Sequence, residues 1–495
     1  MKLSLQEPSL KKISGVLALP VLDGKLHSHS LAKKVDQALG GLLSSFIKKT
    51  EFKGRVAEVE NIATHGKIGA FQVLLVGLGK GKKLEADDLR RAAAASAKAA
   101  ERLKSAKLYS ALSLIDHDWK PEELAQILAE GTVLSTYRFD KFKGKKDPKS
   151  HLAGVEFLLS AIKEKAAFAR GLKLGQVGAE GALYARDLVN TPSHNKPPEV
   201  LGLEAKKLKG VRTRVWKHQE IKKMGMGALY GVGMGSTRHP PVFIEMHYKP
   251  KTKAKKTIAV VGKGITFDSG GLSLKPPKYM ETMKDDMAGA AAVLGLMKIL
   301  PQLNPKVEVY GYISSAENMP GGGAQRPGDV VKAYNGKTIE VLNTDAEGRL
   351  ALADALSYIG KHRKVDYIID MATLTGAALV ALGDLVTAAL GTDEALIKKI
   401  QKAGDFTGEK VWELPLEERY WEDFKSEVAD MRNIGGLYAG TINGALFLKQ
   451  FVPEKTKWVH LDIAGPSWAN KPWTYCPVGG TGIMVRTLAR LLEDF

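Results

Sequence analysis

Two glycine-rich stretches in the second half of the chain concentrate acidic and basic side chains. The first is VGKGITFDSGGLSLKP (261–276) followed by MKDDMAGA (283–290), and the second is NTDAEGRL (343–350). Four acids within them are candidate metal ligands: Asp268, Asp286, Asp345 and Glu347. In one pocket these carboxylates would repel one another, and divalent cations would cancel the repulsion. Because carboxylate-rich sites with few histidines suit hard or borderline ions, the pattern indicates Mg²⁺, Mn²⁺ or Zn²⁺.

The spacing within the second stretch supports this hypothesis. Glu347 follows Asp345 by two residues, so an extended turn could direct both carboxylates toward one pair of cations. Gly348 gives the backbone room, and Arg349 supplies a permanent positive charge nearby.

A simpler explanation of each acid is a helix cap or a surface charge, and any one of them taken alone fits that explanation better. The neighbours Asp285 and Asp286 illustrate the ambiguity, because spacing does not choose between them. The metal hypothesis gains from Lys263 and Lys275, which lie in glycine-lined turns of the first stretch. The residues by themselves leave the two explanations evenly balanced.

Other common catalytic patterns are missing from the sequence. The 11 histidines include no His-Glu-x-x-His pair, and no candidate serine lies in Gly-x-Ser-x-Gly. The segments GLGKG (77–81) and GVGMG (231–235) do not complete a nucleotide-binding pattern, so strand-ending turns explain them better. Cys476 is the only cysteine, which excludes a disulfide within the chain and a cysteine-based zinc site.

The composition is that of a globular protein, since 44% of the 495 residues are hydrophobic and 26% are charged. The N-terminus lacks the pattern of a secretory signal, and no run of about 18 apolar residues suggests a membrane span. With its single cysteine, the chain is therefore expected to be cytoplasmic, without a membrane partner. The net charge of +19 suits attraction to nucleic acid, but solubility explains the charge more simply.

Short apolar segments alternate with helical ones, which indicates an α/β fold. In the first part we expect strands at 71–77 and 155–160 and a helix over 84–108. A mainly helical stretch at 161–190 and a turn-rich stretch at 190–198 should connect two domains. Breaks in that helical stretch are expected at Gly171, Gly175 and Gly178. Strands in the second part are expected at 257–261, 307–313, 365–369 and 458–463, with functional residues on loops at one edge of the sheet.

Four motifs occur in sequence order: KGITFDSGG (263–271), Lys275, KDDMAGAA (284–291) and NTDAEGRL (343–350). They resemble the successive active-site motifs of the leucine aminopeptidase (cytosol aminopeptidase) family of two-metal peptidases. The similarity runs from about residue 185 to the C-terminus and is weak over the first 160 residues. It includes ARDLVNTP (185–192), ENMP (317–320), RPGD (326–329), ATLTGA (372–377) and HLDIAG (460–465).

The resemblance implies a role for each candidate ligand. Asp268 and Glu347 would bridge two cations about 3.5 Å apart. Lys263 and Asp286 would complete the tighter site, which selects Asp286 over its acidic neighbour. Asp345 would complete the more exchangeable site, in part through its backbone carbonyl. Lys263 must be neutral to coordinate a cation, and burial beside two cations would lower its pKa.

The resemblance also implies catalytic and substrate-binding roles. Lys275 would stay charged, polarise the scissile carbonyl and stabilise the gem-diolate that follows attack by the bridging water. Arg349 would hold a bicarbonate ion as general base, because its forked guanidinium suits a planar oxyanion. The free α-amine of a peptide would bind one cation, which favours release of N-terminal residues. Four residues are assigned to substrate binding, with broad preference for leucine-like side chains: Met283, Asn343, Ala464 and Ser467.

The family implies two divalent cations per subunit, Mn²⁺ or Zn²⁺, with Mg²⁺ or Co²⁺ as further candidates for the exchangeable site. It also implies a homohexamer. The implied fold is α/β, with a smaller, macro-like N-terminal α/β domain (1–165) and a connecting helix (166–190). The larger catalytic α/β domain (191–495) would have a mixed central sheet.

The alternative is a DNA-binding architectural or regulatory protein, which the net charge and the basic runs near 141–149 and 249–256 suggest. No helix-turn-helix or zinc-finger pattern supports specific DNA recognition, and the two roles could coexist.

Overall fold

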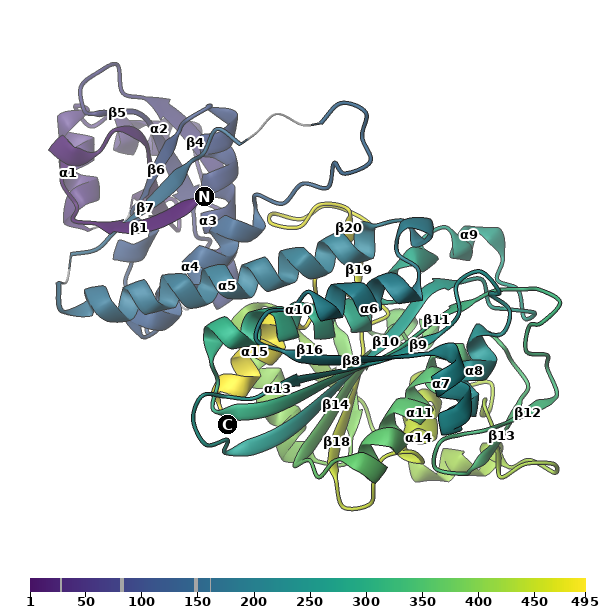
Figure 1. Cartoon of the computed structure of the whole chain (residues 1–495). Helices are drawn as coiled ribbons and strands as arrows, with labels where there is room; N and C mark the ends of the chain where they lie inside the picture. The colour runs from purple at the N-terminus through teal and green to yellow at the C-terminus, as the bar shows by residue number, and fades with distance from the viewer. Residues whose placement is uncertain (27–28, 81–83, 147–149, 161) are drawn as a thin grey trace. The chain divides into compact units, whose positions relative to one another are not determined.

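The computed structural model describes residues 1–26, 29–80, 84–146, 150–160 and 162–495 (Figure 1). The chain divides into two compact units. Unit 1 contains Met1–Glu180 and Lys471–Pro477, and unit 2 contains Gly181–Asn470 and Val478–Phe495. Of the two basic runs noted in the sequence, residues 147–149 lie outside the described residues, and the run near 249–256 forms the loop between two strands of unit 2.

Unit 1 is built on a seven-stranded, mainly parallel sheet. Its strands run in the order β1 (Lys2–Gln6), β7 (Gly154–Leu158), β6 (Lys107–Ser110), β2 (Gly15–Leu22), β5 (Ala70–Gly77) and β4 (Val59–Ala63), with β3 (Lys25–Leu26) paired to β2. The strands expected at 71–77 and 155–160 are confirmed as β5 and β7. The helix expected over 84–108 is shorter: α3 is Ala86–Arg102, and Lys104 with a φ of 53° breaks the helical path before β6.

The helical stretch before unit 2 is continuous, and the breaks expected at its glycines are wrong. Helix α5 runs from Lys165 to Asn190 without interruption. A Cβ atom on Gly171 would lie 2.0 Å from the carbonyl oxygen of Glu122 in α4 (Pro121–Leu134), and one on Gly175 would lie 2.4 Å from that of Gln126. These glycines therefore let two helices approach closely instead of ending one of them.

Unit 2 contains an eight-stranded mixed sheet, as expected. The strand order is β16 (Val411–Glu413), β15 (Thr387–Gly391), β18 (Lys457–Asp462), β14 (Tyr367–Ala372), β10 (Lys256–Asp268), β11 (Val307–Asn318), β9 (Val242–Tyr248) and β8 (Arg212–Lys217). The four central strands β18, β14, β10 and β11 are parallel and correspond to the four expected strands. The stretch 261–276 contains the end of β10, and 283–290 comes after it, whereas NTDAEGRL (343–350) follows β13 (Thr338–Val341), a strand of a separate three-stranded sheet. The expectation that functional residues follow the strands of one sheet therefore holds for the first stretch and not for the second.

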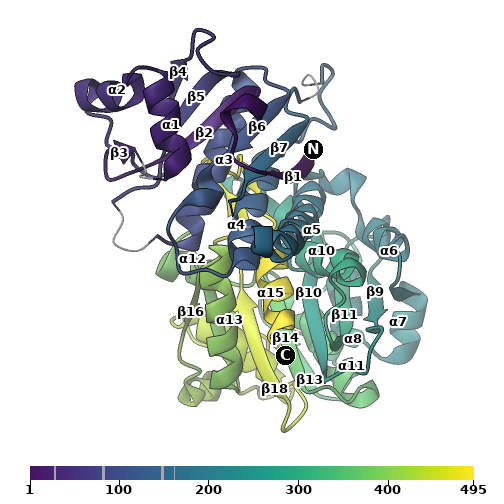
Figure 2. The same ribbon diagram turned by 90° about the vertical axis from the view of Figure 1, so that its left-hand side faces the viewer.

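Helices cover both faces of this sheet (Figures 1 and 2). On one face lie α10 (Ala288–Leu303), α13 (Glu394–Thr407) and α15 (Val485–Glu493), and on the other lie α8 (Gly227–Gly233), α11 (Glu347–His362) and α14 (Gly440–Lys449). The segment 231–235, expected to be a strand-ending turn, instead ends helix α8. Its glycines allow close packing, since a Cβ on Gly231 would lie 3.0 Å from the side chain of Gln325.

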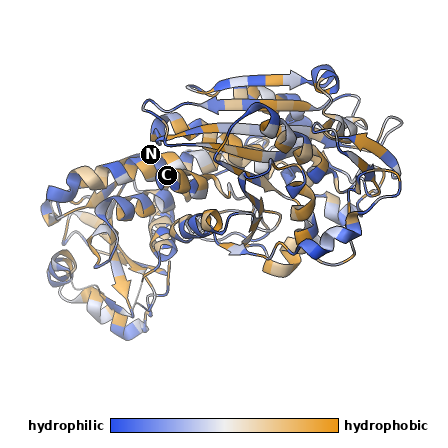
Figure 3. Ribbon diagram, turned by 90° about the horizontal axis from the view of Figure 1, so that it is seen from below, coloured by the Kyte–Doolittle hydropathy of each residue, from blue (hydrophilic) through white to orange (hydrophobic). Residues whose placement is uncertain are grey.

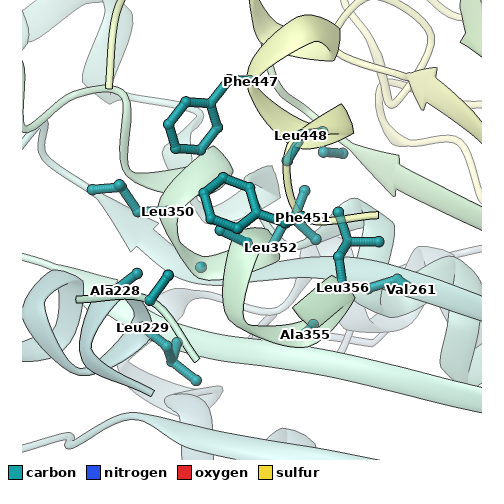
Figure 4. Packing of buried hydrophobic residues seen from close by; sticks show 14 of the residues in the cluster. Ala228, Leu229, Val261, Leu350, Leu352, Ala355, Leu356, Phe447, Leu448 and Phe451 are labelled. Carbon is teal, nitrogen blue, oxygen red and sulfur yellow. The ribbon is translucent and has the colours of Figure 1, made fainter. Parts of the chain in front are cut away.

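The core of unit 2 holds α11 in place. Figure 4 shows Leu350, Leu352 and Leu356 of this helix among side chains of α8, α14 and β10. Hydrophobic residues follow the central strands and the inner sides of the helices (Figure 3). Because α11 begins with Glu347, its packing also fixes the position of a candidate ligand.

Within the described residues, one helical segment, Pro277–Leu303, is long and apolar enough to cross a membrane. However, 78% of its apolar window is buried inside the protein, and its α10 part packs on β10 and β11. A core helix explains these properties.

Candidate metal centre

Strand β10 contains an irregularity that brings two candidate ligands to the same side. The partners of Ile265 and Phe267 on β11 are consecutive residues, so Thr266 is an extra residue in the ladder. Lys263 and Asp268 are five residues apart, and an odd separation in a regular strand places two side chains on opposite faces. The extra residue of a bulge corrects this alternation. Both side chains are buried and contact the same cluster of charges.

The second motif supplies ligands from a turn and a helix start. Asp345 lies in a turn, and Glu347 is the first residue of α11, so the extended turn expected across both residues is wrong. The side chain of Asn343 orders the turn by accepting a hydrogen bond of 2.8 Å from the backbone N–H of Asp345. The start of helix α11 therefore sets the position of the Glu347 side chain, while the turn sets that of Asp345.

Asp286 comes from a third segment. It follows the short 3-10 helix η5 (Met283–Asp285) and precedes α10. Its Oδ1 lies 2.8 Å from Nζ of Lys263 and accepts a hydrogen bond of 2.7 Å from Thr373 Oγ1. Asp286, and not Asp285, thus faces the other candidate ligands.

The four acids and two lysines form one cluster. Lys263 Nζ also lies 2.7 Å from Glu347 Oε1, and Lys275 Nζ lies 2.8 Å from Asp268 Oδ2 and 2.6 Å from Asp345 Oδ1. Ligand atoms of three buried acids lie within 4.8 Å of one another: Asp268, Asp286 and Glu347. Among the described residues, Asp286 Oδ2 and Glu347 Oε2 are buried without a hydrogen-bond partner. The donor set suits hard or borderline divalent cations.

Burial and mutual repulsion set the charge of this cluster. Burial raises the pKa of Asp286 and of Glu347, because a carboxylate loses its hydration there. Burial alone would lower the pKa of Lys263, but attraction to these two acids outweighs it and raises the pKa. The same balance raises the pKa of Lys275, which is attracted chiefly to Asp268. Four carboxylates face two ammonium groups, so the cluster has negative charge that a divalent cation would neutralise.

Sequence reasoning missed several residues that hold the cluster in place. Asn318 ends β11 and donates hydrogen bonds of 2.8 Å to Asp268 Oδ1 and 2.9 Å to the carbonyl of Thr344. It thereby joins the two motifs. The carbonyl of Thr373 accepts a hydrogen bond of 2.9 Å from Lys263 Nζ. Asn318 lies in ENMP (317–320) and Thr373 in ATLTGA (372–377), two stretches that resemble the family. The resemblance therefore marked both residues, but it gave neither of them a role.

Arg349 lies on α11, buried beside the cluster. Its guanidinium donates a hydrogen bond of 3.0 Å to the carbonyl of Asn433, while its Nε is buried without a partner among the described residues. Burial lowers the pKa of Arg349 to about 10, and attraction to Glu347 and Asp462 opposes this shift. The side chain stays positively charged at neutral pH and retains an unused donor.

The four predicted substrate-binding residues are dispersed over three segments. Met283 begins η5 and is half-buried, and Asn343 is held by Asn433 as well as by its own turn. Ala464 is half-buried after β18, whereas Ser467 is only 1% exposed and its hydroxyl donates to the carbonyl of Ala464 at 3.5 Å. Their role in binding a substrate stays a prediction.

Replacing Gly348 by alanine is expected to disturb the cluster without unfolding the protein. A Cβ at this position would lie 2.5 Å from Cε and 2.7 Å from Nζ of Lys263, so the lysine side chain must leave the position in which it pairs with Asp286 and Glu347. We expect metal affinity to fall about tenfold, as for other changes beside metal ligands. Calorimetric titration with Mn²⁺ measures this. Gly322→Ala is the control, because no atom lies within 4 Å of its added Cβ, and equal affinities of the two variants would contradict the prediction.

Family models match both parts of the chain. The model described as the catalytic domain of the cytosol aminopeptidase family matches residues 183–489, and the model of that family's N-terminal domain matches residues 18–146. A probable cytosol aminopeptidase of Aquifex aeolicus is 47% identical over 441 residues, covering 88% of this chain and 87% of the relative. Another from Alkaliphilus oremlandii is 38% identical over 501 residues, covering 100% of this chain and 99% of the relative.

Solved structures agree with these matches. A mutant of tomato leucine aminopeptidase has a TM-score of 0.90 at 35% identity, covering 100% of this chain and 97% of its own. The bottromycin maturation enzyme BotP, in complex with Mn, has a TM-score of 0.85 at 36% identity, covering 97% of this chain and 99% of its own. The matches support a divalent-metal peptidase and give the DNA-binding alternative no support. By these matches and by its two-domain fold, the chain belongs to the cytosol aminopeptidase family.

Proposed function

We propose that this metal-dependent aminopeptidase holds two divalent cations in the cluster of acids at the edge of the unit 2 sheet. The observation that carries the proposal is the close approach of three buried carboxylates, with ligand atoms within 4.8 Å of one another and two oxygens unpartnered among the described residues. Asp268 and Glu347 would contact both cations, Lys263 and Asp286 one of them, and Asp345 the other. Divalent cations in such a site supply Lewis acidity that lowers the pKa of water and polarises a carbonyl group.

The two lysines have different tasks in this proposal. Lys263 would coordinate a cation only without its extra proton, because an ammonium has no lone pair. Cation binding would therefore require the ammonium that pairs with Asp286 and Glu347 to lose a proton. Lys275 keeps its proton and directs it toward the carbonyl oxygen of the scissile bond. Its ammonium would stabilise the negative charge that develops on that oxygen.

The preference for the first peptide bond has a physical basis in Asp286. The α-ammonium of a peptide would release a proton to solvent, and the free amine could then bind a cation and donate a hydrogen bond to this carboxylate. That contact would fix the first carbonyl near Lys275. An internal peptide bond lacks that amine. Four residues would bind the rest of the N-terminal residue, with an apolar wall that favours leucine only weakly over similar side chains: Met283, Asn343, Ala464 and Ser467.

Arg349 would bind bicarbonate, which serves as the general base. Its buried, unpartnered Nε is the observation that favours an anion here, since a planar guanidinium binds a planar oxyanion through two donors. The anion would accept a proton from water and later release it to the leaving amine.

The remaining assignments follow from family membership. Mn²⁺ or Zn²⁺ would occupy the centre, with Mg²⁺ or Co²⁺ in the exchangeable site. The relatives are named cytosol aminopeptidases, which favours a cytoplasmic protein acting on peptides, and a homohexamer is proposed as its assembly. We keep residues 1–165 as the N-terminal domain, 166–190 as the connecting helix and 191–495 as the catalytic domain.

Removal and return of the metal tests the proposed function. Purified protein with added Mn²⁺ is expected to hydrolyse leucine p-nitroanilide, to lose this activity with EDTA and to regain it with excess Mn²⁺ or Zn²⁺. The N-acetylated substrate serves as the control, because it lacks a free α-amine and should be a poor substrate. Activity that survives complete chelation would contradict the metal assignment, and equal cleavage of both substrates would contradict the role of the amine.

A further inference from the structure

A short segment before α6 (Pro198–Lys206) contacts two ligand-bearing segments of the candidate centre. It consists of the 3-10 helix η4 (Ser193–Asn195) and Lys196, and it belongs to the turn-rich stretch 190–198. The proposed reaction makes no use of this stretch. Two of its side chains donate hydrogen bonds to main-chain carbonyls: Ser193 and Lys196.

Ser193 contacts the bulge of β10. Its hydroxyl donates a hydrogen bond of 2.7 Å to the carbonyl oxygen of Thr266, the extra residue of the bulge. Because a bulged residue is left unpaired in the ladder, a partner from outside the sheet stabilises its conformation. Thr266 lies two residues before Asp268, so this bond acts on the backbone that carries a candidate ligand.

Lys196 makes the equivalent contact with η5. Its side chain is 1% exposed, and Nζ donates a hydrogen bond of 2.7 Å to the carbonyl oxygen of Lys284, two residues before Asp286. Burial lowers the pKa of Lys196 to about 7, and the nearby carboxylate of Asp285 opposes this shift. The amine donates the hydrogen bond with or without its extra proton. A buried lysine is unfavourable unless it is well partnered, so a specific structural use is needed to account for it.

We propose that Ser193 and Lys196 are positioning residues that hold the backbone before Asp268 and Asp286 and so set the distance between these two carboxylates for a divalent cation. The inference rests on the proposed metal centre. One short segment makes both bonds, so it links the two ligand-bearing segments. Groups that orient metal ligands in this way contribute to affinity although they do not touch the metal.

Calorimetric titration of metal-free protein with Mn²⁺ tests the proposal. We expect Lys196→Met and Ser193→Ala each to weaken Mn²⁺ binding about tenfold, and the double variant to bind more weakly than either. Activity at limiting Mn²⁺ should fall in the same order, while excess Mn²⁺ should restore kcat toward that of the unaltered protein. A purely structural loss would lower the unfolding temperature without this metal-dependent rescue.

Lys337→Met is the matched control. Lys337 Nζ also donates to a main-chain carbonyl, that of Gln450 at 3.0 Å, but this bond involves none of the ligand-bearing segments. The control should keep the Mn²⁺ affinity of the unaltered protein, even if its unfolding temperature falls equally. If Lys196→Met does not fold, the Mn²⁺ affinity of Ser193→Ala tests the proposal, since this variant removes only one half-buried hydroxyl.

The outcomes separate this inference from the proposed function. Failure of the unaltered protein to bind Mn²⁺ would overturn the metal centre itself. Normal Mn²⁺ binding by the unaltered protein together with unchanged affinity in the folded variants would overturn only the positioning role.

Discussion

Replacing Glu347 by glutamine is expected to lower kcat/KM for leucine p-nitroanilide by more than about 100-fold, since even the partners of metal ligands contribute about 10- to 100-fold. The change preserves the size of a side chain that is 2% exposed but removes a negative charge 2.7 Å from Lys263 Nζ. In the proposed centre Glu347 contacts both cations. Mn²⁺ affinity, measured by calorimetry, should therefore fall together with activity.

Glu245→Gln is the control for this experiment. Glu245 lies on β9, accepts a hydrogen bond of 3.0 Å from Tyr312 and pairs with Arg363, just beyond the end of α11 that lies opposite Glu347. It should keep normal Mn²⁺ affinity. A folded Glu347→Gln variant with full activity would exclude Glu347 as a ligand.

Replacing Lys275 by methionine is expected to lower kcat by about 10²- to 10³-fold, the usual loss when a donor to a developing oxyanion is removed. Methionine keeps the apolar stem but cannot stabilise negative charge on the scissile carbonyl. Steady-state kinetics at saturating Mn²⁺ measure the effect, and kcat should change more than KM.

Metal binding distinguishes this variant from Glu347→Gln. Lys275 pairs with Asp268 at 2.8 Å and with Asp345 at 2.6 Å, so the ammonium competes with cations for the same oxygens. Its removal should leave Mn²⁺ affinity unchanged or tighter, whereas loss of Glu347 weakens it. Lys278→Met, which alters an exposed lysine three residues later, should have no effect. A weakened Mn²⁺ affinity in Lys275→Met would indicate a ligand rather than a catalytic cation.

The candidate site could be named from the sequence to a large extent because its residues lie in long contiguous motifs. The physical argument alone left Asp285 and Asp286 equivalent, and only the resemblance chose between them. In the structure Asp286 contacts Lys263, while Asp285 lies near the amine of Lys196. Both aspartates are buried, so burial could not have separated them. The partner of each side chain at the end of η5 separates them.

The errors in the fold have a common cause, which is that local patterns omit the packing partner. Gly171 and Gly175 looked like helix breaks because glycine lowers helix propensity, yet the nearby carbonyls of α4 leave no space for a Cβ. The bulge at Thr266 is invisible without the register of β11. Lys196 gave no signal, since a lone lysine among turn formers is usually exposed.

The bulge has a consequence for recognising this centre in other genomes. Measured on β11, Lys263 and Asp268 are four positions apart, opposite Ser314 and Asn318, although five separate them along their own chain. A strand with a regular ladder could present the same pair on one face only at an even interval. An odd interval between the lysine and the aspartate in the sequence therefore indicates a β-bulge between them in the strand. A relative that has lost or gained one residue between these two positions has an even interval, so it should keep the pair on one face by a regular strand without the bulge.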